Sequence, residues 1–179
     1  MLKRDSCENN EQHTLFQEWE RRSMAIEQQH NKIVFTRTFE APVQAVYQAY
    51  TDRTQFEQWF HPEGATTEVY QFDVKPGGRA FFAIKAPQGT SYTVMKYNKV
   101  VPHQCIDYYD YFADEKGNVD KNMIGMHNII ELKDLSDRTE LTSTAVLPTE
   151  TAAKKLLEMG VEAGMESTFD HLEQLLARN

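Results

Sequence analysis

The most distinctive chemical feature of the sequence is a strand-like segment that alternates acidic and phenolic side chains. It reads CIDYYDYF over residues 105–112. Because side chains alternate across a strand, each face combines one Asp with at least one Tyr. One face holds Ile106, Tyr108, Asp110 and Phe112, and the other holds Cys105, Asp107, Tyr109 and Tyr111. A buried carboxylate needs a hydrogen-bond partner. The segment therefore predicts a self-satisfied Tyr–Asp pair, a strand end already in water, or a polar anchor inside an apolar pocket.

An aromatic group forms a second candidate site at the end of a short helical segment. It consists of Trp59, Phe60 and His61. Two interpretations stay open: core aromatics beside a solvated histidine, or a lid at a cavity mouth whose amphipathic rings contact a ligand.

A polar residue interrupts the apolar face of the strand expected near residues 123–132. Asn128 stands between Met126 and further apolar positions of that face, so we expect it to point inward. It is either satisfied by neighbouring groups or in contact with a ligand. Met165 and Phe169 belong to the apolar face of the last helix, where they would form walls of the same pocket.

Two glycines lie four residues apart in that last helix, beside its apolar stripe. Gly160 and Gly164 each cost about 1 kcal/mol relative to Ala in a helix interior. Close packing of the helix on the sheet, room for a ligand above the helix, and simple exposure are the three open explanations.

Several kinds of site find no support in the sequence. The six histidines show no zinc-type spacing, and no nucleophile elbow, P-loop or dinucleotide-binding motif occurs. We therefore predict no metal, no cofactor and no catalytic residue of a nucleophilic kind.

Hydrophobic periodicity predicts the elements that position these residues. We expect strands with even spacing, two short helices and one long terminal helix with a continuous apolar face. The strands are expected at residues 33–39, 66–74, 79–85, 91–101, 104–113, 123–132 and 138–147. The short helices are expected between residues 43 and 60, with Thr51-Asp52 capping the second of them, and the long helix at 149–177, with Thr149 as its N-cap. This order predicts a twisted antiparallel sheet that wraps around the long helix and leaves a gap between them.

The first 31 residues differ in composition from the rest. They are charged and Gln-rich. A thin apolar stripe predicts a surface helix over residues 11–29, and its members are Leu15, Phe16, Trp19 and Ile26. We expect a helical extension at 1–31 and one domain at 32–179. The stripe needs cover from its own domain, a partner or a second copy, so a monomer and a homodimer are both open.

Bulk composition limits the partners and the compartment. A formal net charge of -8 disfavours nucleic acid. The sequence contains no run of about 18 apolar residues, so we expect no transmembrane helix. The N-terminus lacks the apolar region of a signal peptide, and two cysteines do not make a disulfide framework. We therefore expect a cytoplasmic protein.

Six blocks of the sequence carry a resemblance to a known family. They are IVFTRTFEAPVQAVYQAYTD, QFEQWFHPEG, DVKPGGRAFF, VVPHQCIDYYDYFADEKGN, RTELTSTAVLPT and MGVEAGMESTFDHLEQLL. In their order and spacing the chain resembles the START-like (SRPBCC) superfamily, in the branch named for the activator of heat-shock protein 90 ATPase. The resemblance covers residues 33–177 and implies an α+β helix-grip (Bet v 1-like) fold, while the N-terminal extension falls outside it.

The fold hosts binding proteins, co-chaperone domains and cyclase-like enzymes, so three functions follow as hypotheses. The first is binding of a small hydrophobic or aromatic molecule between the sheet and the last helix. The second is a co-chaperone-like interaction with a protein partner, through the N-terminal extension and the acidic surface. The third is a cyclase-like or hydratase-like enzyme with Asp110 or His61 as general base. The residues favour binding over catalysis.

Overall fold

Eight antiparallel strands form one curved sheet in the computed structural model, which describes residues 24–122 and 125–178. The strand order is β1-β2-β8-β7-β6-β5-β4-β3. The strands are β1 Ala25–Gln29, β2 Lys32–Phe39, β3 Thr66–Phe72, β4 Arg79–Ala86, β5 Gly89–Val101, β6 Cys105–Ala113, β7 Met126–Asp134 and β8 Thr139–Val146. The helices within these residues are α2 Val43–Thr51, α3 Arg53–Trp59, α4 Glu150–Glu158 and α5 Val161–Leu176.

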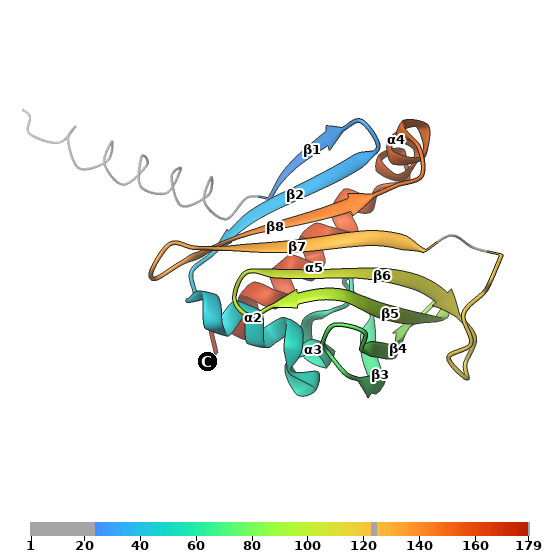
Figure 1. The fold of residues 1–179 in the computed structure, drawn as a ribbon, viewed down its shortest axis with the longest axis horizontal. Helices are drawn as coiled ribbons and strands as arrows, with labels where there is room; N and C mark the ends of the chain where they lie inside the picture. Colours follow the sequence, from blue (N-terminus) through green and yellow to red (C-terminus); the bar gives the residue numbers. More distant parts are fainter. Residues whose placement is uncertain (1–23, 123–124, 179) are drawn as a thin grey trace, which may run out of the picture.

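The sheet curves around helix α5, which runs along one face of it (Figure 1). Helices α2 and α3 follow β2 directly and lie near α5 at one end of the sheet (Figure 1). Between these layers lies a core of fully buried side chains. The largest of them are Trp59, Phe39, Phe56, Phe82, Phe169, Ile33, Ile106, Leu141 and Leu172. The arrangement is the helix-grip fold expected from the sequence.

Two short-range signals at helix starts are confirmed. The Asp52 carboxylate accepts a hydrogen bond from the Gln55 backbone N–H at 2.9 Å and caps α3. The Thr149 hydroxyl accepts one from the Ala152 N–H at 3.1 Å and caps α4. Each side chain thereby satisfies a backbone donor that has no partner within its helix.

The predicted continuous helix over residues 149–177 is wrong, because the chain breaks between α4 and α5. Gly160 adopts a left-handed conformation with a φ of +83°. Its N–H donates to the Leu157 carbonyl at 3.0 Å, which closes the last turn of α4. A glycine adopts this conformation without the steric cost that a Cβ would add. Gly160 is therefore a helix terminator and not an interior glycine, whereas Gly164 does lie inside α5.

The predicted helix over residues 11–29 is wrong at its C-terminal end. Residues 25–29 form strand β1, which pairs with β2 from Ala25 opposite Thr36 to Gln29 opposite Lys32. His30, with a φ of 55°, makes the tight connection. Pairing with a neighbouring strand here overrides the helical preference of a Glu- and Gln-rich segment. The sheet thus begins at Ala25, before the expected domain start at 32.

The remainder of the expected N-terminal helix, with Leu15 and Trp19, lies outside the described residues. Ile26, the last member of its apolar stripe, is part of β1 and packs partly buried against the core.

An inward-facing arginine fastens α5 to the sheet. Arg37 of β2 is 4% exposed. Its two terminal nitrogens donate to Asp170 at 2.7 Å and to Glu173 at 2.6 Å, both on α5. The alternation of β2 places Arg37 between the core residues Phe35 and Phe39. Two salt bridges from Arg37, as well as apolar packing, therefore hold α5 against the sheet.

The described helices are too short or too polar to cross a lipid bilayer.

Candidate ligand-binding site

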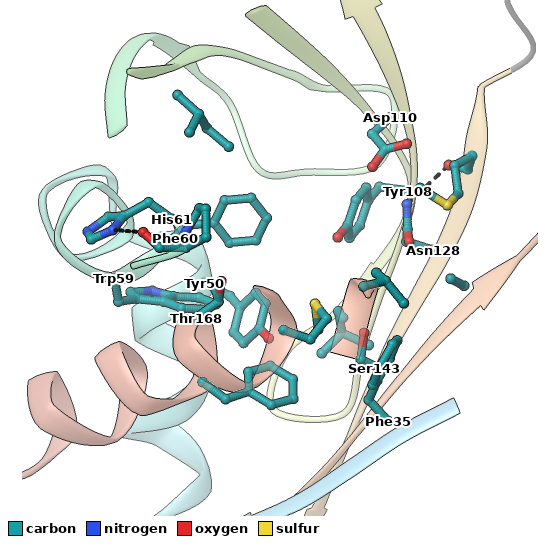
Figure 2. Close-up of a pocket in the computed structure, with 18 of the residues that line it drawn as sticks. Phe35, Tyr50, Trp59, Phe60, His61, Tyr108, Asp110, Asn128, Ser143 and Thr168 are labelled. Atoms are coloured by element: carbon teal, nitrogen blue, oxygen red, sulfur yellow. Dashed lines mark hydrogen bonds between the residues drawn. The ribbon is translucent and has the colours of Figure 1, made fainter. Parts of the chain in front are cut away.

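A cavity of about 180 Å³ lies between the inner face of the sheet and α5 (Figure 2). Its walls come from β2, β4, β6, β7, β8 and all four helices or their connections. The lining residues are Phe35, Tyr50, Trp59, Phe60, His61, Pro62, Ile84, Tyr108, Asp110, Met126, Asn128, Ile130, Ser143, Ala145, Leu156, Val161, Met165, Thr168 and Phe169. Aromatic and aliphatic side chains dominate the walls, and a few polar groups interrupt them.

The register of β6 and β7 settles which face of the Tyr/Asp strand points inward. Tyr108 pairs with Asn128, and Asp110 pairs with Met126. All four residues line the cavity. Figure 2 shows Tyr108, Asp110 and Asn128 side by side on the sheet wall. The sheet therefore presents one carboxyl, one phenol and one carboxamide to the same space.

The other residues of β6 lie elsewhere. Asp107 and Tyr109 are on the outer face, where the His127 Nε2 lies 2.9 Å from the Asp107 carboxylate and the rings of Tyr109 and His127 stack 4.5 Å apart. Phe112 shares the inner register of Asp110 but is 60% exposed, beyond the part of the strand that faces the cavity.

Burial changes the acidity of Asp110. Loss of solvent around the carboxyl raises its pKa to about 6, although hydrogen bonds from the Asn128 side chain and from backbone N–H groups partly oppose the rise. Asp110 thus exchanges its proton near neutral pH, unlike an ordinary aspartate.

Two phenol groups at the cavity have no protein partner within residues 24–122 and 125–178. They belong to Tyr108 of β6 and Tyr50 of α2, which are 7% and 6% exposed. Burial raises the pKa of both hydroxyls, so both stay protonated donors at neutral pH. Figure 2 shows both rings bordering the space between the sheet and α5.

Trp59 and Phe60 close the cavity on the side of α3. The Trp59 indole N–H donates to the Ala49 carbonyl at 2.9 Å, which holds α3 against α2. Phe60 stacks on Phe56 with ring centroids 4.4 Å apart. Both rings therefore belong to the aromatic core and also border the cavity, so the two interpretations of this group are not exclusive.

His61 lines the cavity, but its ring nitrogens face the backbone. Nδ1 lies 3.1 Å from the Pro62 carbonyl oxygen and Nε2 lies 3.3 Å from that of Gln58. Its ring packs on His171 of α5 with centroids 4.5 Å apart. Only one nitrogen of a neutral imidazole carries a proton, and in either tautomer that N–H points at a backbone carbonyl. Both ring nitrogens of His61 are thus directed at the backbone and not into the cavity, whereas the Asp110 carboxyl lines the cavity.

Of the predicted site residues, Gly160 and Gly164 lie outside the cavity lining. A Cβ built at either position meets no atom within 4 Å. Gly160 ends α4 and separates it from α5, and Gly164 faces open space. The other predicted positions, Trp59, Phe60, His61, Tyr108, Asp110, Met126, Asn128, Met165 and Phe169, line the cavity, and their contact with a ligand stays a prediction.

Sequence reasoning missed several polar lining residues. Tyr50, Ser143 and Thr168 come from α2, β8 and α5. Each looks unremarkable in its own segment. The inward alternation of β8 could have indicated Ser143, whose neighbours Leu141 and Ala145 share its face. Tyr50 and Thr168 enter the site through the way their helices pack.

The described part of the chain contains no cluster of His, Cys, Asp or Glu side chains that could hold a metal ion.

Comparisons with known proteins place this geometry in context. The sequence model of the family described as "Activator of Hsp90 ATPase homolog 1-like protein" matches residues 40–177. A solution structure from Staphylococcus epidermidis is 50% identical, with a TM-score of 0.80 over 87% of this chain and 94% of that chain. No curated protein matches the sequence.

More distant solved structures share the fold. Protein Ms6760 from Mycobacterium smegmatis is 24% identical, with a TM-score of 0.77 over 86% of this chain and 97% of that chain. CalU16 from Micromonospora echinospora is 19% identical, with a TM-score of 0.57 over 86% of this chain and 85% of that one.

Proposed function

Because the chain belongs to the family of activator of Hsp90 ATPase homologue 1-like proteins, within the START-like superfamily, we propose that it binds a small hydrophobic or aromatic molecule between the sheet and α5. The observation that carries the proposal is a largely apolar cavity whose wall includes the phenol groups of two mostly buried tyrosines, Tyr50 and Tyr108, together with the Asp110 carboxyl. Ligand pockets typically combine apolar walls with a few convergent polar groups.

The size of the cavity limits the ligand. The cavity volume of about 180 Å³ is smaller than that of pockets for drug-sized ligands, which is roughly 300 to 1,000 Å³. It is close to the volume of an apolar cavity that accepts benzene, about 150 Å³. We therefore infer a ligand whose buried part is about one aromatic ring or a short alkyl group.

Calorimetric titration with 2-phenylethanol tests this proposal. A one-ring ligand of this kind should bind with a Kd of about 0.1 to 1 mM. Ala145 of β8 lines the cavity, so Ala145→Leu fills part of the space and should weaken binding at least fivefold. Ala163→Leu makes the same change on an exposed position of α5 and should leave affinity unchanged. Equal affinity in the two variants would argue against the cavity as the binding site.

An enzyme that uses Asp110 as general base is a second candidate. The observation that favours it is a carboxyl at the cavity wall whose pKa is raised to about 6 by burial, near the value that suits a base at neutral pH. A direct test is exchange of the methyl protons of acetophenone into D2O, followed by NMR. Faster exchange with the wild type than with Asp110→Asn supports catalysis, and equal rates contradict it.

A co-chaperone role is the candidate that the family description itself suggests. The ATPase rate of the host's own Hsp90-type chaperone should then rise when this protein is added. An unchanged rate, together with no co-purification of the two proteins, would dismiss this role. Ala145→Leu should have no effect on such stimulation, which separates it from ligand binding.

A further inference from the structure

Asp110 is a half-buried carboxyl at the cavity wall without a cationic partner in the described part of the chain. The ion pairs that these residues form do not include it. The basic side chains nearest along β5 and β7 turn to the opposite face. Lys96 lies over the Tyr111 ring with its nitrogen 5.0 Å from the centroid, and His127 pairs with Asp107. A carboxylate that has lost part of its water is stabilised by a nearby positive charge, and Asp110 has none of these side chains beside it.

The groups around Asp110 supply dipoles but no positive charge. The polar neighbours of Asp110 are Tyr108 on β6, Asn128 on β7 and Tyr50 on α2. On β5, Met95 pairs with Asp110. The cavity-lining residues of the last two helices are apolar or carry hydroxyls: Leu156, Val161, Met165, Thr168 and Phe169.

Two further titratable groups lie near this site. Tyr97 of β5 lies close enough to Tyr108 to contribute to the rise of the Tyr108 pKa. Burial raises the pKa of Tyr97 itself, so its phenol is neutral. His61 lines the cavity with both ring nitrogens directed at backbone carbonyls. An ionised Asp110 is therefore stabilised by hydrogen bonds but by no positive charge among these groups, and its partial loss of water makes the charged form unfavourable.

We propose that the ligand of this cavity is a small organic cation, a protonated amine on an aromatic or short alkyl body, with Asp110 as its counter-ion. This inference rests on the proposed ligand-binding function and specifies its chemical class. An ammonium group donates a charge-assisted hydrogen bond to the carboxylate. The phenol oxygens of Tyr50 and Tyr108 can accept its other N–H groups, and the aromatic walls favour a cation near their faces. A carboxylate ligand would be repelled by Asp110.

Three one-ring probes of similar shape and different charge test the proposal: 2-phenylethylamine, 2-phenylethanol and phenylacetate. At pH 7.5 we expect calorimetry to give the amine at least tenfold higher affinity than the alcohol, and to give phenylacetate no measurable binding. Asp110→Asn should reduce the amine to the affinity of the alcohol. The matched control is Asp107→Asn, on the outer face of the same strand, which should retain the preference for the amine.

The pH dependence adds an independent readout. Burial raises the pKa of Asp110 to about 6, and the amine stays protonated below pH 8. Its affinity should therefore rise about tenfold from pH 5 to pH 7 as Asp110 ionises, while that of the alcohol should not rise. Asp110→Asn should abolish the increase. An increase that persists in Asp110→Asn would assign it to another group, such as His61, and overturn the role of Asp110.

The outcomes separate this inference from the function on which it rests. Binding of the alcohol without preference for the amine would overturn the cation proposal and leave the binding function standing. Failure of all three probes to bind would overturn both. A preference for the amine that survives in Asp110→Asn would show that the cation binds elsewhere on this acidic protein, and would also contradict the proposal.

Discussion

At the scale of single residues, position changes the chemistry of two charged side chains. Asp110 lies on the wall of a largely apolar cavity, where burial disfavours its charged form and raises its pKa to about 6. Arg37 is buried as well, but α5 supplies two carboxylates to it. The first arrangement leaves a charge available to a ligand, and the second uses a charge to hold the fold.

The raised pKa of Asp110 predicts a specific pH dependence of stability. The folded protein holds this proton more tightly than the unfolded chain, so the group favours folding most below about pH 4, and this contribution is lost as the pH rises through 6. A rise in pKa from 3.8 to about 6 corresponds to about 3 kcal/mol. In urea titrations from pH 4 to pH 7, Asp110→Asn should therefore gain about that much stability relative to the wild type.

The control for this measurement is Asp137→Asn, since the Asp137 side chain is 84% exposed. Its stability curve should run parallel to that of the wild type. If the curve of Asp110→Asn is also parallel to that of the wild type, the desolvation of Asp110 is disproved.

Removal of Arg37 should destabilise the protein. Arg37→Ala deletes both contacts to α5 and leaves a space beneath the helix, while Asp170 and Glu173 keep some access to water, 52% and 30% for their side chains. We expect a loss of about 2 to 4 kcal/mol in the free energy of unfolding, measured with urea. Arg138→Ala removes the contact of Arg138 with the exposed Asp137 and should cost less than about 1 kcal/mol. Similar losses in the two variants would contradict the anchoring role of Arg37.

At the scale of elements, the last two helices show how one residue divides a continuous apolar pattern. The stripe from Leu157 to Leu176 predicts a single helix, but the left-handed Gly160 ends α4 and lets α5 start in a new direction. Both halves contribute to the cavity, through Leu156 of α4 and Val161 and Met165 of α5. The break thus shapes one end of the site, although Gly160 does not line it.

The two helix glycines should respond to alanine with opposite signs. Neither added Cβ would meet an atom within 4 Å, so backbone conformation alone decides. Gly160→Ala places a side chain at a φ of +83° and should cost about 1 to 2 kcal/mol. Gly164→Ala adds a helix former inside α5 and should stabilise by about 0.5 to 1 kcal/mol. Thermal unfolding followed by circular dichroism measures both, and a shift of the same sign in the two variants would refute this assignment of the helix break.

At the scale of the whole molecule, the sheet begins earlier than the sequence suggests, which predicts two different truncations. A chain that starts at Met24 retains β1, whereas one that starts at Lys32 exposes the edge of β2. Because loss of the β1 ladder removes several backbone hydrogen bonds and the partial burial of Ile26, the shorter chain should be less stable by about 2 kcal/mol or more. Equal unfolding midpoints for the two chains would show that β1 does not contribute to the sheet in solution.

The sequence predicted most of the architecture, because the strands from β2 to β8 are rich in β-branched and aromatic residues and are separated by segments with Gly, Pro and Asp. It could not decide the face of β6, since Asp107 and Asp110 give both faces an acid. It could not identify Gly160 as a break, since the apolar pattern continues across it. Tyr50 and Thr168 reach the cavity through sheet curvature and helix packing, which no local pattern encodes.

The central claim, a ligand cavity under α5, is tested most directly by NMR titration of the 15N-labelled protein with 2-phenylethylamine. Two side-chain signals report on the cavity: the Trp59 indole N–H and the Asn128 carboxamide, both from residues that line it. We expect saturable shifts of both signals, with the largest backbone shifts on the inner face of β6 and β7 and on α5. Shifts that spread over exposed acidic residues, or no shifts at saturating amine, would contradict it.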